Sequence, residues 1–105
     1  MSTLDEARDP ETTPERLVDL ARDGEWEVRA AVAGNTSAPQ ELLTELSRDG
    51  EWYVRRAVAK NRSAPTSTLT FLTGDEDEDV VKAAQETLAT RSRSTFAWGM
   101  TVGGL

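Results

Sequence analysis

The sequence predicts an all-α protein built as a short solenoid of helical repeats, with an extended tail at its C-terminal end. Three observations support this fold class. Residues 22–46 and 48–72 superpose after a shift of 26 positions, with 17 of 25 residues identical. Apolar residues within each copy recur at the spacing of a helix face. The last twelve residues, 94–105, carry no charge and share no pattern with the repeat.

The repeat organises most of the chain. Residues 12–21 resemble residues 37–47 and therefore form the back half of a preceding unit. Residues 74–89 keep the spacing with a degenerate sequence, as terminal capping units do. We expect a repeat domain over residues 1–90, with units at about 10–21, 22–47, 48–73 and 74–90, followed by a linker and tail over residues 91–105.

Each unit is predicted to hold two short helices. In the stretch SAPQELLTELS, Ser37 is expected to be the N-cap, and Leu42, Leu43 and Leu46 lie on one face. An Arg-Asp-Gly turn then ends the helix, and a glycine such as Gly50 suits a left-handed C-cap.

The second helix of the unit is expected to begin near Glu25 and to end at Asn35. One apolar face carries Val28 and Val32, and a neighbouring face carries Trp26 and several alanines. A helix with two apolar faces packs on both sides, which is how stacked repeats bury a shared core.

The stretch WEVRAAVAGNTSAPQELL, residues 26–43, resembles the leucine-rich repeat variant family, a relative of HEAT-like helical solenoids. In HEAT-like stacks, an aspartate in the turn and an arginine six residues later form ladders between units. The resemblance assigns this role to Asp23 with Arg29 and to Asp49 with Arg55. Val81 stands where the third arginine would be, so we expect the ladder to end there. A member of the family carries a cysteine-ligated iron–sulfur cluster, which does not carry over because this chain has no cysteine.

Composition argues against several classes of function. The net charge is −7, and all 19 acidic residues lie between Asp5 and Glu86, which disfavours binding to nucleic acid or to an anionic membrane. The chain has no cysteine and no histidine. The acidic run 75–79 lacks the ligand spacing of a calcium loop and is interpreted as a helix cap. We expect a cytoplasmic protein that is no enzyme and has no metal or cofactor of its own.

Five residues are candidates for binding a protein partner: Trp26, Trp52, Tyr53, Arg56 and Lys60. The two tryptophans occupy equivalent repeat positions, where they either anchor the packing between units, which we favour, or line a groove. Arg56 and Lys60 replace Ala30 and Gly34 of the preceding unit, so they are the cations expected to lack a structural partner.

The tail is expected to be extended, because three of its last seven residues are glycine and Thr, Val, Phe and Trp favour strands. Either it docks on its own repeats and covers the end of the solenoid, or it is presented to another protein. In the second case, the residues presented for modification are Thr95, Trp98, Gly99, Met100, Thr101, Val102, Gly103 and Gly104.

The layout resembles the precursor of a ribosomally made, post-translationally modified peptide, with residues 1–93 as the leader and residues 94–105 as the core. The apolar core, rich in valine and glycine, is similar to those of the borosin family. That resemblance implies a partner enzyme that methylates backbone amides, and the S-adenosylmethionine would belong to this enzyme. Alternatively, residues 101–105 resemble the peptides that direct cargo into encapsulin shells, or the chain is a plain interaction scaffold.

Overall fold

The computed structural model describes residues 2–103, and it describes side chains for residues 2–91. The described residues form helices only, which confirms the all-α class. Their bounds are α1 Thr3–Arg8, α2 Pro14–Leu20, α3 Trp26–Gly34, α4 Gln40–Leu46, α5 Trp52–Lys60, α6 Thr66–Leu72 and α7 Glu78–Gly103.

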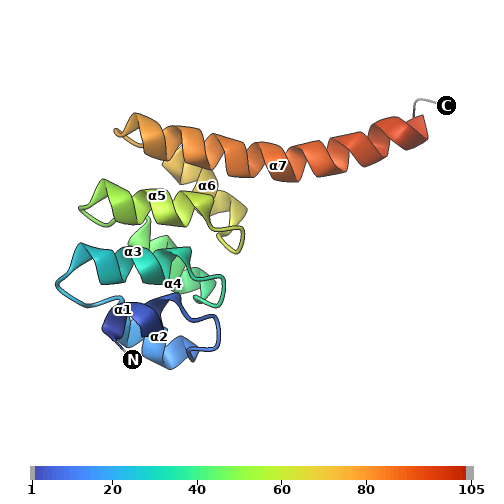
Figure 1. The fold of residues 1–105 in the computed structure, drawn as a ribbon. Helices are drawn as coiled ribbons and strands as arrows, with labels where there is room; N and C mark the ends of the chain where they lie inside the picture. The colour runs from blue at the N-terminus through green and yellow to red at the C-terminus, as the bar shows by residue number, and fades with distance from the viewer. Residues whose placement is uncertain (1, 104–105) are drawn as a thin grey trace.

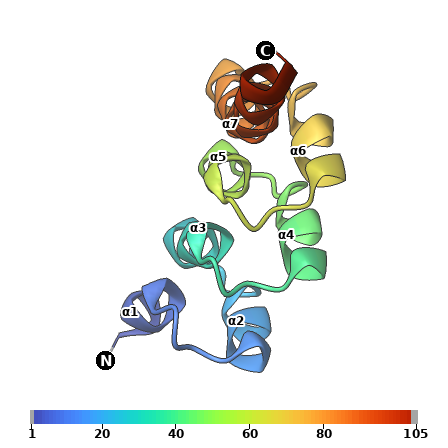
Figure 2. The same cartoon turned by 90° about the vertical axis from the view of Figure 1, so that its right-hand side faces the viewer.

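The helices stand in two columns. Helices α1, α3, α5 and α7 lie one above the other, and α2, α4 and α6 form a second column beside them (Figures 1 and 2). Equivalent helices begin 26 residues apart, as Pro14, Gln40 and Thr66 show for the second column. The architecture is a stack of two-helix repeats in which each helix of the first column packs on the next.

The core follows from the apolar spacing within the helices. Val32 on α3 and Val54 and Val58 on α5 are fully buried between successive helices of the first column. Leu17, Leu43 and Leu69 are equivalent residues of α2, α4 and α6, and each is fully buried where the two columns meet. No unit buries these residues alone, so stacking supplies the stability of the fold.

Helix α1 was not predicted from the sequence. Ser2 caps α1 by accepting a hydrogen bond from the Asp5 amide, and the Asp5 side chain accepts one from the Ser2 amide in return. Ala7 of α1 is fully buried, as is Ala33, the residue one period later on α3. Helix α1 is therefore the shortened counterpart of α3 and begins the first column.

Two local predictions were wrong. Helix α4 begins at Gln40 after Pro39, and the Ser37 hydroxyl instead donates to the Pro10 carbonyl in the neighbouring unit. Among the described residues, no glycine has a positive φ angle. Helix α4 ends at Leu46, and its C-cap Ser47 has right-handed backbone geometry. The Asp49 amide then donates to the Leu46 carbonyl, so the chain turns before Gly50 is reached.

The expectation of an extended tail was also wrong, because α7 continues as a helix to Gly103. A helix that is already formed grows without a new nucleus, and its packed first part supplies that nucleus here. Three glycines disfavour a helix here on sequence grounds. Gly103 is the last residue of α7, and Gly104 lies outside the described residues. Of the three, only Gly99 lies inside the helix.

Candidate functional site

Helix α5 carries most of the predicted partner-binding residues on one face. Trp52, Tyr53, Arg56 and Lys60 recur at the spacing of helical neighbours, and the opposite side of α5 buries Val54 and Val58 in the core. The exposed face of α5 is therefore fixed by the packing of its buried face.

An aromatic stack joins this face to α3. Tyr53 stacks on Trp26 of α3 with ring centroids 4.7 Å apart, and it also stacks on Trp52 with centroids 3.8 Å apart. Both tryptophans pack partly buried against the core, whereas Tyr53 is 44% exposed. The two tryptophans therefore pack between the repeats, and Tyr53 is the ring of this stack that is most exposed to solvent.

A hollow of about 230 Å³ lies between α3 and α5 beside this stack. It is lined by Gly34, Tyr53, Arg56, Ala57, Lys60 and Asn61. A Cβ atom added at Gly34 would meet no atom within 4 Å, so the missing side chain leaves the hollow open at this point. We call these six residues, together with Trp26 and Trp52, the α3–α5 groove.

The polar groups of the α3–α5 groove are mostly hydrogen-bond donors. Within residues 2–91, the side chains of Arg56 and Lys60 make no hydrogen bond or ion pair, and neither does the Tyr53 hydroxyl. The buried Asn61 amide, by contrast, is already bonded to the backbone of the neighbouring unit. The groove therefore offers two cations and a hydroxyl to a ligand that supplies acceptors.

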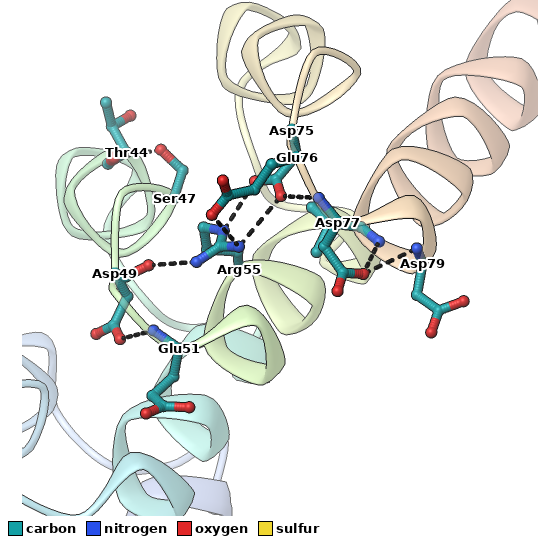
Figure 3. A network of polar contacts seen from close by, with 10 residues as sticks. Thr44, Ser47, Asp49, Glu51, Arg55, Asp75, Glu76, Asp77 and Asp79 are labelled. Atoms are coloured by element: carbon teal, nitrogen blue, oxygen red, sulfur yellow. Dashed lines mark hydrogen bonds and ion pairs between the residues drawn. The ribbon is translucent and has the colours of Figure 1, made fainter.

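The predicted ladder residues lie at the ends of the helices, on a different part of the molecule. Arg29 donates from Nε to Asp49 Oδ2 at 2.8 Å, and its Nη1 donates to the carbonyl of Asp23. Arg55 repeats this arrangement one unit later, with Asp75 Oδ2 at 2.8 Å and the Asp49 carbonyl as acceptors (Figure 3). Each arginine joins the turn of its own unit to the turn of the next.

Electrostatics within the ladder follow from this pairing. The hydrogen bond to Asp49 raises the pKa of Arg29, and the hydrogen bond to Asp75 raises the pKa of Arg55. Burial alone would raise the pKa of Asp49, but hydrogen bonds from Arg29 and from the Glu51 amide outweigh burial and leave this pKa below its ordinary value. Folding therefore favours the charged carboxylate.

The acidic run 75–79 serves the ladder and the start of α7. Asp75 accepts from Arg55, while Asp77 Oδ1 accepts from the backbone amides of Asp79 and Val80 (Figure 3). Asp77 thereby caps the first turn of α7. Among the side chains that the structure describes, no three acidic groups converge where a metal ion would be held.

Buried asparagines form a second ladder, which was not predicted from the sequence. Asn61 Nδ2 donates to the carbonyls of Ala33 and Asn35, and Asn35 Nδ2 donates to those of Ala7 and Asp9 in the unit before. Thr87 takes the equivalent place on α7 and donates to the Ala59 carbonyl. The recurrence of Asn35 and Asn61 at the repeat period was the available signal.

The tail residues form the far end of α7. The backbone places Thr95, Trp98, Gly99, Met100, Thr101, Val102 and Gly103 in the helix, and their side chains lie outside the described set. Gly104 lies outside the described residues altogether. Figure 1 shows this end of α7 running past the stacked helices, and the turned view of Figure 2 shows it pointing toward the viewer.

These features define a protein of stacked helical repeats. Residues 1–62 match the family model of the Leucine Rich Repeat Variant domain, so the chain belongs to the leucine rich repeat variant family. The match begins at the first residue and so includes α1. Comparisons with curated proteins and with solved structures give no match.

A repeat domain of this family indicates a protein-interaction module, because stacked repeats build an extended surface from neighbouring helices. Within the described part of the chain, no helix combines the length and apolar character that crossing a bilayer requires.

Proposed function

We propose that this protein is a binding module that holds a modifying enzyme through its repeats and presents residues 94–105 to that enzyme as the substrate. The observation that carries the proposal is the course of α7, which packs on α5 and α6 and then runs beyond the stack (Figure 1). A segment in this position is accessible to a second protein.

Arg91 supports this division of the helix. Its Nη2 donates to the carbonyls of Arg62 and Ala64, both at 2.7 Å, and its Nη1 donates to Thr66 Oγ1. Arg91 therefore ties α7 to the loop between α5 and α6 at the point where the uncharged segment is about to begin. We place the joint between leader and core at residues 91–93.

Backbone N-methylation is the chemistry we propose, on the compositional likeness of residues 94–105 to borosin cores. The helical amides of this segment donate hydrogen bonds within α7, so the enzyme has to unwind it before a methyl group reaches the nitrogen. Each N-methylated residue then lacks a donor and opposes return to the helix, as proline does. The repeats raise the effective concentration of this short segment at the active site.

Co-expression tests the proposal directly. The proposal predicts a methyltransferase gene beside the gene of this chain. The two proteins are produced together, and residues 94–105 are fragmented by mass spectrometry. We expect methyl increments on backbone amides within these residues, and far fewer on a free peptide of residues 94–105 offered to the same enzyme. An unmodified segment refutes the proposal, and its co-purification with a protein shell would favour a cargo tag instead.

A further inference from the structure

We propose that the α3–α5 groove binds an acidic segment of the partner protein, in which two carboxylates flank an apolar side chain. This inference rests on the proposed function in one respect, namely that the repeats bind a protein. It adds the chemistry of the segment that they recognise and the residues that recognise it.

The donors of the groove select for carboxylates. Arg56 and Lys60 are one helical turn apart on α5, which brings their stems within about 6 Å of each other. Within residues 2–91, both cations and the Tyr53 hydroxyl lack a hydrogen-bonding partner. Three donors around one hollow call for a ligand with several acceptors, and two neighbouring carboxylates supply them.

The charge distribution of the chain makes the two cations distinctive. The equivalent positions are Ala30 and Gly34 on α3 and Lys82 and Glu86 on α7, so α5 is the helix of this column that carries both cations. The protein as a whole carries a net charge of −7. A positive pair on an acidic surface attracts a short anionic segment only when that segment fits closely. Its placement in a groove, away from the arginines of the ladder, indicates recognition and not repeat packing.

The lining also provides an apolar contact. Ala57 and the open space at Gly34 border the hollow, and the ring of Tyr53 stands beside them. An apolar side chain of the partner fits against these surfaces while its acidic neighbours reach the cations. Aromatic and arginine side chains at the centre of a surface are the usual anchors of protein interfaces.

A nucleic acid fits this groove less well. Exposed acids Glu27 and Asp79 occupy the positions equivalent to Tyr53 on α3 and α7. On α7, exposed Lys82 and Glu86 occupy the positions equivalent to Arg56 and Lys60. A phosphate backbone has a high, continuous charge density and would pass the three acids Glu27, Asp79 and Glu86 as it crosses the column. A short segment with only two carboxylates places its charges at the two cations of the groove.

The neighbouring repeat supplies matched variants. Arg56→Ala with Lys60→Gly gives α5 the residues that α3 already carries at these positions, so we expect the fold to accept them. Gly34→Leu places a side chain in the hollow, at a position where a Cβ atom would meet nothing within 4 Å. Arg22→Ala with Arg62→Ala removes two positive charges from exposed sites that do not line the groove.

The test is selection of random linear peptides displayed on phage against the immobilised full chain, followed by fluorescence polarisation with the recovered peptides. We expect a consensus of two acidic residues around an aromatic or aliphatic residue. Binding should weaken about tenfold or more in Arg56→Ala/Lys60→Gly, as expected when charge-assisted hydrogen bonds are lost. Gly34→Leu should weaken it as well, and the exposed control pair should leave it unchanged.

Four outcomes overturn the inference: no acidic consensus, no recovered peptide, undiminished binding by the double variant, or tighter binding of a single-stranded oligonucleotide than of the peptides.

The inference and the proposed function fail separately. If residues 94–105 are methylated at equal rates in wild type and double variant, the groove assignment fails alone. If the acidic peptides bind the groove while the tail stays unmodified, the proposed function fails alone.

Discussion

Arg55 and Asp75 bind each other across two repeats through a forked pair of hydrogen bonds, with Nε to Oδ2 at 2.8 Å and Nη2 to Oδ1 at 3.2 Å. Both side chains are largely buried, with 11% and 7% of their surface exposed. Because the third arginine nitrogen, Nη1, donates to the Asp49 carbonyl, Arg55 couples the turn before α5 to the turn before α7.

Arg55→Ala should lower the free energy of unfolding by about 2–4 kcal/mol, because it leaves the Asp75 carboxylate buried without its partner. Urea denaturation followed by circular dichroism measures this loss. Arg55→Lys should recover only part of it, since an ammonium group cannot form the same fork.

The pair of Arg16 and Glu6 provides the control, because its side chains are 46% and 31% exposed. Arg16→Ala should cost much less than Arg55→Ala, as solvent already screens that pair. Equal losses from the two variants would show that the repeat ladder contributes no more than a surface ion pair.

Because folding lowers the pKa of Asp49, the free energy of unfolding should depend on pH. A carboxylate whose folded pKa lies below its unfolded value stabilises the protein above the unfolded pKa, and this contribution is lost as the pH falls through the folded pKa. The difference in unfolding free energy between wild type and Asp49→Asn should therefore be constant above pH 5 and shrink below the ordinary value of 3.8. Urea titrations across this range measure it, and a difference that grows with acid would refute the pairing.

Replacing an asparagine of the buried ladder should lower the free energy of unfolding by a large amount for so small a side chain. Asn61→Ala removes two donated hydrogen bonds, to the carbonyls of Ala33 and Asn35, and one accepted from the Ser63 amide. The buried groups left without partners should lower the free energy of unfolding by about 2–4 kcal/mol. Asn61→Thr should lose less, because Thr87 keeps one such bond at the equivalent position. Thermal denaturation that ranks the threonine variant with alanine would contradict this role.

Deletion of residues 94–105 should leave the melting temperature within about 2 °C of the full chain. The backbone of α7 runs beyond the stacked helices at this end (Figure 1), so we expect the deleted segment to contribute little to the fold. Differential scanning calorimetry makes the comparison, with Arg91→Ala as the variant expected to lower the melting temperature. A marked loss on deletion would instead support a tail docked on its own repeats.

The repeat made much of the fold predictable from sequence. A shift of 26 residues aligned α3 with α5 and α4 with α6, and it placed Arg29 and Arg55 at equivalent positions of α3 and α5. Helix α1 escaped this comparison because its six residues keep little of the pattern beyond Ala7. The helical course of residues 94–103 escaped it too, because local propensity carries no information about a helix that is already nucleated upstream.

The residues of the candidate site could be predicted from the sequence, but the shape of the groove that they form could not. Arg56 and Lys60 stood out because they break the repeat, and helical spacing placed them on one face with Tyr53. The stacking of Tyr53 on both Trp26 and Trp52 depends on how two repeats pack, which the order of residues does not specify. The depth of the groove likewise depends on Gly34 lying opposite α5.

The mass of residues 94–105 in the protein isolated from the cells that make it tests the central claim most directly. If the repeats present this segment to a methyltransferase, its fragments carry methyl increments that map to backbone amides, while residues 1–93 remain unmodified. An unmodified segment in the presence of the active enzyme, or modifications confined to the repeats, would contradict the account.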